Sequence, residues 1–369
     1  MRFLQNDLKI KPLARAETIP SDWYTDPAMN AFERKTIFDK TWQFVCHISK
    51  LSNPGDHAVA SVADNPVLVV RGSDGSLRAF YNVCRHRGGP IAVEDGCGVK
   101  ALQCKYHGWT YTLEGHLRGV PKFDRTELFN KKDYGLVPVN LDIWDGLIFV
   151  NLDEKPAPLA KFYHGISERI HPLKLEPMRF HQRVIYDVQC NWKVYVDNYL
   201  EGYHLPFVHP ELCKLLDYAQ YQTETFEYYS LQHSPITPEE NIYTSGAGTA
   251  FYYFVFPNFM LNILPGRLQT NLVLPLSHDR CRVIFDYHYN DTESEIARKK
   301  IDDDLKYSDW VQHEDITICE HVQKGLNSKA YTKGRFSVEM ENAVHHFQSL
   351  LKTYYKKSQS RSSKRKISK

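Results

Sequence analysis

Short alternating runs of apolar and polar residues fill the first half of the chain, from about residue 51 to residue 153. Examples are 66–70, 109–112 and 147–152, and turns that contain glycine follow several of them. Runs of this length with period-two alternation, bounded by turn residues, are typical of β-strands. The pattern therefore predicts a small all-β unit, and the proline-containing segment 154–159 predicts a linker after it.

The second half of the chain mixes longer strand-like runs with helical segments. The expected strands are 184–188, 251–256, 269–274 and 282–289. One helix is expected at 191–202, closed by Pro206, because proline removes a backbone donor and clashes with the preceding turn. A charged helical stretch at 292–326 is expected in two pieces. An antiparallel sheet with helices on one side is an α+β pattern, so we predict that fold class.

Length and composition agree with a folded chain of two domains. The 369 residues exceed one typical core, and 42% of them are hydrophobic. The net charge is only +2, but the stretch from Lys352 onward carries eight Lys and Arg residues and no acid. We expect this basic, serine-rich tail to be disordered, and no other feature indicates nucleic-acid binding.

The start of the chain and its lack of long apolar runs indicate a cytoplasmic protein. Charged residues interrupt the first twelve positions, where a signal peptide needs a continuous apolar stretch. No run approaches the ~18 apolar residues that span a bilayer, so no membrane association is expected. In a reducing compartment, cysteines are first interpreted as metal ligands or catalytic groups and not as disulfides.

Two cysteines and two histidines form the first candidate metal site. Cys84-x-His86 is followed after 17 residues by Cys104-x-x-His107. Such a set suits a zinc ion or a [2Fe-2S] cluster with mixed ligation. The cluster is favoured because two thiolates can hold one iron while two imidazoles hold the other, and zinc sites more often repeat C-x-x-C units. Glycines on both loops also allow the backbone to approach a cluster closely.

The remaining cysteines show no metal-site spacing. We interpret all of them as small buried residues. They are Cys46, Cys97, Cys190, Cys213, Cys281 and Cys319.

A second candidate metal site lies in the segment 191–210. In Glu201-x-x-His204-x4-His209, the first two residues are expected on one face of a helix, and Pro206 ends that helix so that the chain can bring His209 back. Two neutral imidazoles and one carboxylate form a facial triad for Fe(II), which leaves positions open for O₂ and substrate.

Two carboxylates compete for the third place in the triad. One is Glu201, and the other is Asp315, which falls within an apolar stripe of the expected helix, whereas Glu314 lies nearly a right angle away. The stripe consists of Val311, Ile318, Val322 and Leu326. A core-facing carboxylate is costly unless it is paired or binds a metal, so Asp315 is favoured as the ligand. A capping or salt-bridged role for Asp315 is the alternative.

Both patterns resemble those of Rieske non-haem iron oxygenases. C-x-H-x17-C-x2-H with the trailing GWTY is typical of the Rieske domain, and the segment from Glu201 to His209 is similar to the catalytic-domain signature of the family's α subunits. The similarity covers roughly residues 30–345. It implies a Rieske [2Fe-2S] domain and a larger catalytic domain of the helix-grip type, with a mononuclear Fe(II) held by His204, His209 and Asp315.

The resemblance also implies a catalytic role for Glu201. In the family, the acid three residues before the first histidine is not a ligand. It connects, by hydrogen bonds, a cluster-binding histidine of one subunit to an iron-binding histidine of the next. Carried over by position, Glu201 would link His107 of one chain to His204 of its neighbour in a head-to-tail ring, commonly a homotrimer. Many members have Asp here, and the longer Glu resembles quaternary-amine oxygenases.

These features divide the chain into four expected parts. An N-terminal helical segment (1–40) packs on the catalytic domain, the Rieske domain spans 41–155, and the catalytic domain spans 156–350. The basic tail covers 351–369.

The expected activity is that of the terminal oxygenase in a multicomponent system. The chain has no GxGxxG motif, so a partner reductase or ferredoxin must deliver electrons from NAD(P)H. A non-catalytic Rieske electron carrier is the alternative from another class. Iron analysis separates the two, because an oxygenase holds about three irons per chain and a carrier about two.

The substrate is predicted from the aromatic runs 226–234 and 251–259, which either line a pocket or belong to the sheet core. If they line a pocket, aromatic faces favour a quaternary ammonium compound of the choline, betaine or carnitine type through cation–π contacts. The alternative is hydroxylation of an aromatic ring or O-demethylation of an aromatic compound.

Overall fold

A computed structural model describes residues 3–236 and 248–367 of the protein, which forms two compact units. Unit 1 combines Met1–Thr36 with Met178–Lys369, and unit 2 comprises Ile37–Pro177. Within the described ranges, no helix is both long enough and apolar enough to cross a membrane.

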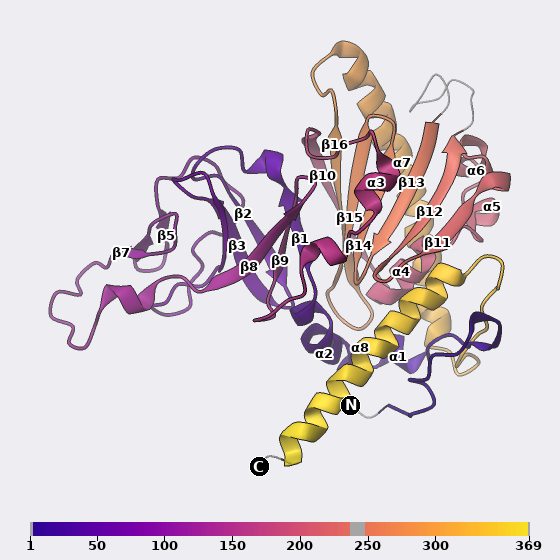
Figure 1. Cartoon of the computed structure of the whole chain (residues 1–369), viewed down its shortest axis with the longest axis horizontal. Helices are drawn as coiled ribbons and strands as arrows, with labels where there is room; N and C mark the ends of the chain where they lie inside the picture. Colours follow the sequence, from indigo (N-terminus) through magenta and orange to yellow (C-terminus); the bar gives the residue numbers. More distant parts are fainter. Residues whose placement is uncertain (1–2, 237–247, 368–369) are drawn as a thin grey trace. The chain divides into compact units, whose positions relative to one another are not determined.

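Unit 2 is an all-β unit with two antiparallel sheets (Figure 1). The larger sheet has the strand order β1-β9-β8-β4-β3-β2, and the smaller one has the order β5-β6-β7. Its strands are β1 (Gln43–His47), β2 (His57–Val62), β3 (Asn65–Arg71), β4 (Leu77–Tyr81), β5 (Leu102–Gln103), β6 (Thr110–Tyr111), β7 (Leu117–Gly119), β8 (Pro138–Trp144) and β9 (Leu147–Asn151). A short helix, α3 (Ile166–Ile170), follows β9.

Strand β3 shows how the apolar pattern builds unit 2. Its residues Val67 to Val70 are fully buried, and successive side chains point to opposite faces of the sheet. Val67 and Val69 pack into one hydrophobic cluster, whereas Leu68 and Val70 pack into the other. The second cluster contains Cys84 and Cys104, so this strand directly supports the first candidate metal site.

Unit 1 is built on one seven-stranded antiparallel sheet with the order β10-β16-β15-β14-β13-β12-β11. Its strands are β10 (Arg179–Val188), β11 (Gln222–Thr225), β12 (Tyr229–Ile236), β13 (Gly248–Val255), β14 (Phe259–Leu264), β15 (Arg267–Pro275) and β16 (Cys281–Tyr289). Its helices are α1 (Asp22–Thr25), α2 (Pro27–Thr36), α4 (Trp192–Tyr199), α5 (Leu205–Val208), α6 (Leu212–Leu215), α7 (Glu295–Leu326) and α8 (Asn342–Ile367). The predicted α+β class, with a small all-β domain and a larger sheet flanked by helices, is confirmed.

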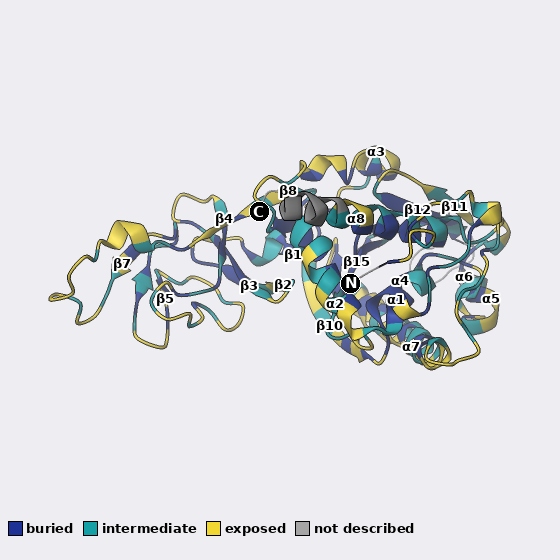
Figure 2. Ribbon diagram, turned by 90° about the horizontal axis from the view of Figure 1, so that it is seen from below, coloured by how far each residue is buried: buried dark blue, intermediate teal, exposed yellow. Residues whose placement is uncertain are grey.

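Helix α7 is one continuous helix and not the two pieces that we expected. Ser294 caps its start by accepting a hydrogen bond from the backbone N–H of Ala297 at 3.2 Å. Neither proline nor an internal break interrupts the 32 residues, and the helix lies over the sheet with most of its residues exposed or half-buried (Figure 2). Its charged sequence therefore reflects a solvated outer side.

The chain end differs from the expected disordered tail. Residues 342–367 form helix α8, and residues 368–369 lie outside the described residues. Leu351 and Tyr355 are fully buried, and the ring of Tyr355 stacks on Phe3 at a centroid distance of 5.3 Å. The positive charge of this segment does not prevent helix formation, because these apolar side chains pack its first half against the protein and no proline or glycine interrupts it.

The boundary between the units also differs from the expected linker at 154–159. The segment after this linker stays with unit 2 as far as Pro177. The backbone N–H of Leu175 donates to the Asp145 carboxylate at 3.1 Å, and Leu175 itself is fully buried. The two prolines therefore mark a bend within unit 2, which the composition of the segment does not distinguish from a domain boundary.

Candidate metal centres

Cys84 and Cys104 start two loops with the same backbone turn. Gly88 donates its N–H to the carbonyl of Cys84, and Gly108 donates to that of Cys104, both at 3.0 Å. Both glycines have φ of +74°, a conformation that side chains with a Cβ rarely adopt. Each loop thus requires glycine four residues after its cysteine. Because the two turns have the same backbone geometry, they place the two cysteines in equivalent positions.

His86 and His107 lie close together, with their ring centroids 4.6 Å apart. The His86 ring stacks on Trp109 at 4.8 Å, which fixes its orientation. Its Nδ1 atom is buried without a hydrogen-bond partner among the described residues. A buried imidazole nitrogen normally finds a partner, so this atom suits a metal ligand.

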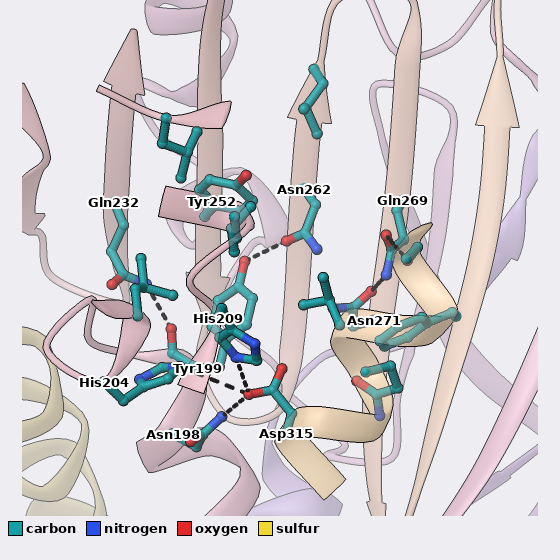
Figure 3. Close-up of a pocket in the computed structure, with 18 of the residues that line it drawn as sticks. Asn198, Tyr199, His204, His209, Gln232, Tyr252, Asn262, Gln269, Asn271 and Asp315 are labelled. Atoms are coloured by element: carbon teal, nitrogen blue, oxygen red, sulfur yellow. Dashed lines mark hydrogen bonds and ion pairs between the residues drawn. The ribbon is translucent and has the colours of Figure 1, made fainter. Parts of the chain in front are cut away.

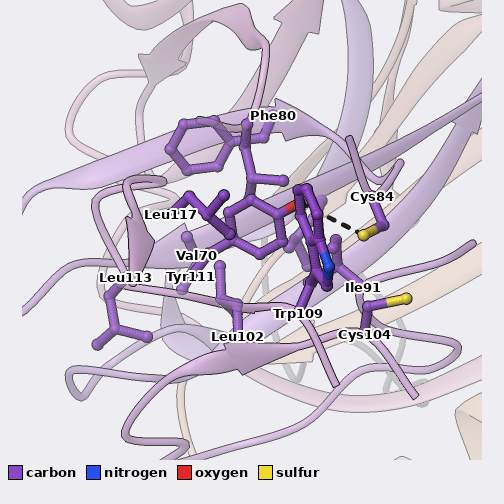
Figure 4. Close-up of a cluster of buried hydrophobic side chains, with 12 residues drawn as sticks. Val70, Phe80, Cys84, Ile91, Leu102, Cys104, Trp109, Tyr111, Leu113 and Leu117 are labelled. Atoms are coloured by element: carbon purple, nitrogen blue, oxygen red, sulfur yellow. Dashed lines mark hydrogen bonds between the residues drawn. The ribbon is translucent and has the colours of Figure 1, made fainter. Parts of the chain in front are cut away.

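The two thiols lie in the apolar interior of unit 2, only 2–3% exposed (Figure 4). Burial raises the pKa of the Cys104 thiol, so a thiolate there needs a positive partner such as iron. The hydroxyl of Tyr111 lies 3.4 Å from Cys84 Sγ and accepts the backbone N–H of Arg85 at 3.0 Å. Hydrogen bonds to ligand sulfurs tune a cluster's potential. Tyr111 ends the GWTY motif, but the motif alone does not predict its contact with Cys84.

A single zinc ion requires all its donors close together, because Zn–S and Zn–N bonds are only about 2.0–2.3 Å long. Among the described residues, the set with at least three donor atoms within 4.8 Å of one another is His204, His209 and Asp315. The cluster residues are not part of such a set. Their wider spacing and the two matched loops suit a group with two metal ions.

The second candidate site brings His204, His209 and Asp315 together in unit 1. Oδ1 of Asp315 lies 2.9 Å from Nε2 of His209 and 3.8 Å from Nε2 of His204. Both histidines therefore point the same ring nitrogen at one carboxylate. This donor set is the two-histidine, one-carboxylate arrangement that suits Fe(II).

Two further carboxylates hold these rings from behind. Nδ1 of His204 lies 2.8 Å from Glu201, and Nδ1 of His209 lies 2.7 Å from Glu314. A carboxylate only accepts hydrogen bonds, so each Nδ1 donates its proton to the carboxylate beside it, and Nε2 is the nitrogen that would bind a metal ion. Such carboxylate–histidine pairs orient metal ligands and increase their basicity.

The electrostatics of His209 also suit a cation. Burial by itself would lower its pKa, but hydrogen bonds and charges from Asp315 and Glu314 raise the pKa above its ordinary value. Because a proton and a metal ion compete for the same lone pair, a site that attracts the proton also attracts the ion. Asn198 donates to Oδ1 of Asp315 at 2.6 Å and holds this carboxylate in place.

The local structure around Glu201 and His204 differs from the expected helix. Helix α4 ends at Tyr199, so Glu201 and His204 lie in the turn after it and not on one helical face. Pro206 does not close this helix but lies in the first turn of the next one, α5, where its missing N–H costs nothing. The two side chains still meet, because the Glu201 carboxylate also accepts the backbone N–H of His204 at 3.0 Å.

The expected apolar stripe on α7 is also wrong in part. Val322 is 45% exposed, and the buried residues of the helix are mainly polar. They are Ile301, Asp304, Gln312, Cys319 and Gln323. Asp315 lies beside this polar inner face, which covers the hydrogen-bonding groups of α4 and the sheet. Glu314, which the stripe excluded, is the partner of His209.

A cavity of about 840 Å³, including volume open to solvent, adjoins the three residues (Figure 3). Helices α4 to α7 and strands β12 to β16 supply its walls. Six aromatic residues line it, namely Tyr195, Tyr199, Tyr221, Tyr252, Phe285 and Tyr307. Of the aromatic runs that we expected at a pocket, only Gln232 and Tyr252 contribute to the lining. Most of the aromatic wall therefore comes from segments that were not expected to line a pocket.

The other cysteines divide into buried and accessible ones. Cys46, Cys190, Cys281 and Cys319 are buried as expected, whereas Cys213 is half-buried and Cys97 is exposed. Cys97 lies in the irregular connection between the two cluster loops, outside any helix or strand.

Comparisons with known proteins agree with both centres. The family of the Rieske [2Fe-2S] domain matches residues 41–133, and the ring hydroxylating alpha subunit (catalytic domain) matches residues 175–357. The first match contains all four cluster residues, and the second contains His204, His209 and Asp315.

Similar proteins act on quaternary ammonium compounds. The chain is 36% identical to the chloroplastic choline monooxygenase of Arabidopsis thaliana, over 92% of this chain and 83% of that protein. It is 31% identical to the carnitine monooxygenase oxygenase subunit of Escherichia coli (strain K12), over 92% and 94%. Its fold matches the quaternary ammonium Rieske monooxygenase CntA in complex with L-carnitine, with a TM-score of 0.86, 27% identity and coverage of 96% and 99%.

Proposed function

The chain belongs to the Rieske oxygenase α subunits, and from this premise we propose that it is the terminal oxygenase for a quaternary ammonium substrate. One observation carries the proposal: the His204, His209 and Asp315 set lies in the wall of a cavity rich in aromatic side chains. Aromatic faces attract a quaternary ammonium ion, and the triad leaves positions free for O₂ beside it. The overall reaction inserts one oxygen atom into a C–H bond and reduces the other to water with two electrons and two protons.

The residues divide the work between the two centres. Cys84, His86, Cys104 and His107 would hold the cluster, and His204, His209 and Asp315 would hold the mononuclear iron. When bound, the cluster supplies single-electron transfer and the iron supplies O₂ activation. Glu201 and Glu314 keep the two imidazoles in the tautomer that presents Nε2. The aromatic wall excludes water and orients the cation.

Electrons must come from a reductase or ferredoxin partner, and we propose that they cross between subunits through Glu201. Its carboxylate bonds His204 and is partly exposed, and the neighbouring Tyr203 and Phe207 are 51% and 81% exposed. Large exposed apolar side chains beside such a group suit a protein interface. A structure of a related quaternary ammonium Rieske monooxygenase is described as revealing inter-subunit electron transfer. A head-to-tail homotrimer is the assembly that we propose, and the cytoplasmic location stays a prediction.

A substrate screen tests the activity. Purified protein with a surrogate reductase and NADH is offered choline, carnitine and aromatic ring compounds, and the oxygenated product is identified by mass spectrometry. We expect product only from quaternary ammonium compounds, with one O₂ consumed per product. Turnover of an aromatic compound alone, or about two irons per chain instead of about three, would contradict the proposal.

Glu201→Gln tests the electron path. We expect unchanged iron and cluster contents but a loss of coupled turnover of about 100-fold or more, because the amide lacks the charge that holds His204. Glu295→Gln, an exposed residue in the first turn of α7, is the matched control and should turn over normally. Undiminished product formation by Glu201→Gln would refute the role of this residue.

A further inference from the structure

Arg267 is the only Lys or Arg among the described residues that line the cavity. Its guanidinium is already engaged. Nε donates to Oδ2 of Asp304 at 2.8 Å, Nη2 donates to the side chain of Gln269, and the group lies over the Tyr287 ring at 5.6 Å. Arg267 and Asp304 are 5% and 2% exposed. The positive charge of Arg267 is therefore neutralised by Asp304 and not by a ligand in the cavity.

Asp304 depends on this pair in turn. It also accepts a hydrogen bond from the hydroxyl of Tyr289 at 2.5 Å. Residues of two strands, β15 and β16, therefore hold the Asp304 carboxylate beside Arg267. If Arg267 turned toward the carboxylate of a ligand, Asp304 would remain as a buried anion without its cationic partner. Breaking one side of a buried ion pair is strongly unfavourable. The pair thus opposes the binding of an anionic group.

The remaining polar groups at this end of the cavity are neutral (Figure 3). Tyr199 donates to Oδ1 of Asn262 at 2.6 Å, and Gln269 donates to Oδ1 of Asn271 at 2.8 Å. These are two separate hydrogen-bonded pairs of neutral side chains. They provide hydrogen bonds without a net charge.

Two cavity-lining groups of α7 have no hydrogen-bond partner within the described part of the chain. They are the hydroxyl of Tyr307 and Nε2 of Gln312, and both atoms are buried. The oxygen of Gln312 accepts from Tyr195 at 2.6 Å, which fixes the orientation of the amide. Buried polar groups without a partner are rare and suit a ligand that supplies one. A hydroxyl group both donates and accepts, so it can pair with either of these groups.

We propose that the cavity selects quaternary ammonium compounds whose other end is an uncharged hydroxyl, the amino alcohols of the choline type, over zwitterions that carry a carboxylate. The Arg267–Asp304 pair is the specificity determinant, and Tyr307 anchors the hydroxyl. This inference rests on the proposed function and names the substrate class of the same site.

The wild-type enzyme provides the first test. We expect kcat/KM for choline to exceed that for carnitine, γ-butyrobetaine and glycine betaine by about 10-fold or more. Equal or better turnover of a carboxylate-bearing compound would overturn the inference and leave the proposed function intact. The absence of turnover with every quaternary ammonium compound would instead contradict the proposed function.

Two variants test the residues. Asp304→Asn removes the charge that holds Arg267, so the preference for choline over carnitine should fall about 10-fold, while the exposed neighbour Asp303→Asn should keep the wild-type preference. Tyr307→Phe keeps the aromatic ring but loses the hydroxyl, so KM for choline should rise about 10-fold with kcat and iron content preserved. An unchanged preference in Asp304→Asn with a normal iron content would refute the role of the pair, and an unchanged KM in Tyr307→Phe would refute that of Tyr307.

Discussion

The two metal centres are built in opposite ways. All four cluster residues lie between Cys84 and His107, on two loops whose turns repeat the same hydrogen bonds. In the second centre, His209 and Asp315 are 106 residues apart and come from different elements. The first centre is fixed by local backbone geometry, whereas the second is fixed by the packing of α4 against α7.

Contacts between these helices show how the second centre is held. Tyr195 of α4 donates to Gln312 of α7 at 2.6 Å, and Asn198 of α4 donates to Asp315 at 2.6 Å. The start of α4 is tied in the same way, because the backbone N–H of Asn191 donates to Gln323 at 2.8 Å. A polar seam therefore positions the carboxylate ligand. We therefore expect single substitutions to remove the cluster completely or leave it intact, and to weaken binding of the mononuclear iron in graded steps.

The largest effect is expected from Cys104→Ser. A serine oxygen replaces a buried thiolate ligand poorly, so the variant should lose the whole cluster, which is about two of about three irons per chain, and all coupled turnover. Iron analysis and the visible absorbance of the cluster measure this loss. Cys97→Ser is the matched control, because Cys97 is exposed on the connection between the loops and should keep both irons. Retention of the cluster absorbance by Cys104→Ser would show that the first centre is not held as proposed.

A smaller loss of iron is expected from Asp315→Asn. The amide removes the only anionic ligand of the second centre, so about one iron per chain should be lost while the cluster absorbance stays. Product formation should fall below detection. The exposed Asp303→Asn on the same helix should retain about three irons per chain. An Asp315→Asn variant with full iron and normal turnover would exclude this residue as a ligand.

The same contrast explains which parts the sequence predicted. The cluster residues were predicted because the ligands of each short loop are only two or three residues apart in the sequence, so their spacing forms a recognisable motif. Strands β10, β13, β15 and β16 of the large sheet were also predicted near their observed positions, and β15 and β16 are long, mostly buried runs, whereas β11, β12 and β14 were not predicted as strands. The contact of Tyr111 with Cys84 was not predicted, although Tyr111 lies in the GWTY motif, because it depends on the folded arrangement of separate loops and strands.

The second centre was predicted only in part. The spacing of His204 and His209 gave a signal, but the end of α4 at Tyr199 did not, because the nearest glycine, Gly202, lies three residues further along and indicated a later end. Hydrophobic periodicity failed on α7, where the inner face carries Gln312 and Gln323 to satisfy polar partners. A rule that seeks apolar stripes therefore set Glu314 aside, although this residue orients His209.

The smallest effect is expected from Glu314→Gln, and it distinguishes graded from all-or-none loss. The amide oxygen can still accept the proton on Nδ1 of His209, so the ring keeps its orientation and loses only the neighbouring charge. We expect iron affinity at the second centre to fall about 10-fold, whereas Glu314→Ala, which removes the hydrogen bond as well, should cost about 100-fold. Titration of the iron-depleted protein with Fe(II) measures both, with Glu295→Gln as the control. Equal losses in the two Glu314 variants would mean that the charge alone matters, and the second centre would then behave like the cluster, with no intermediate state.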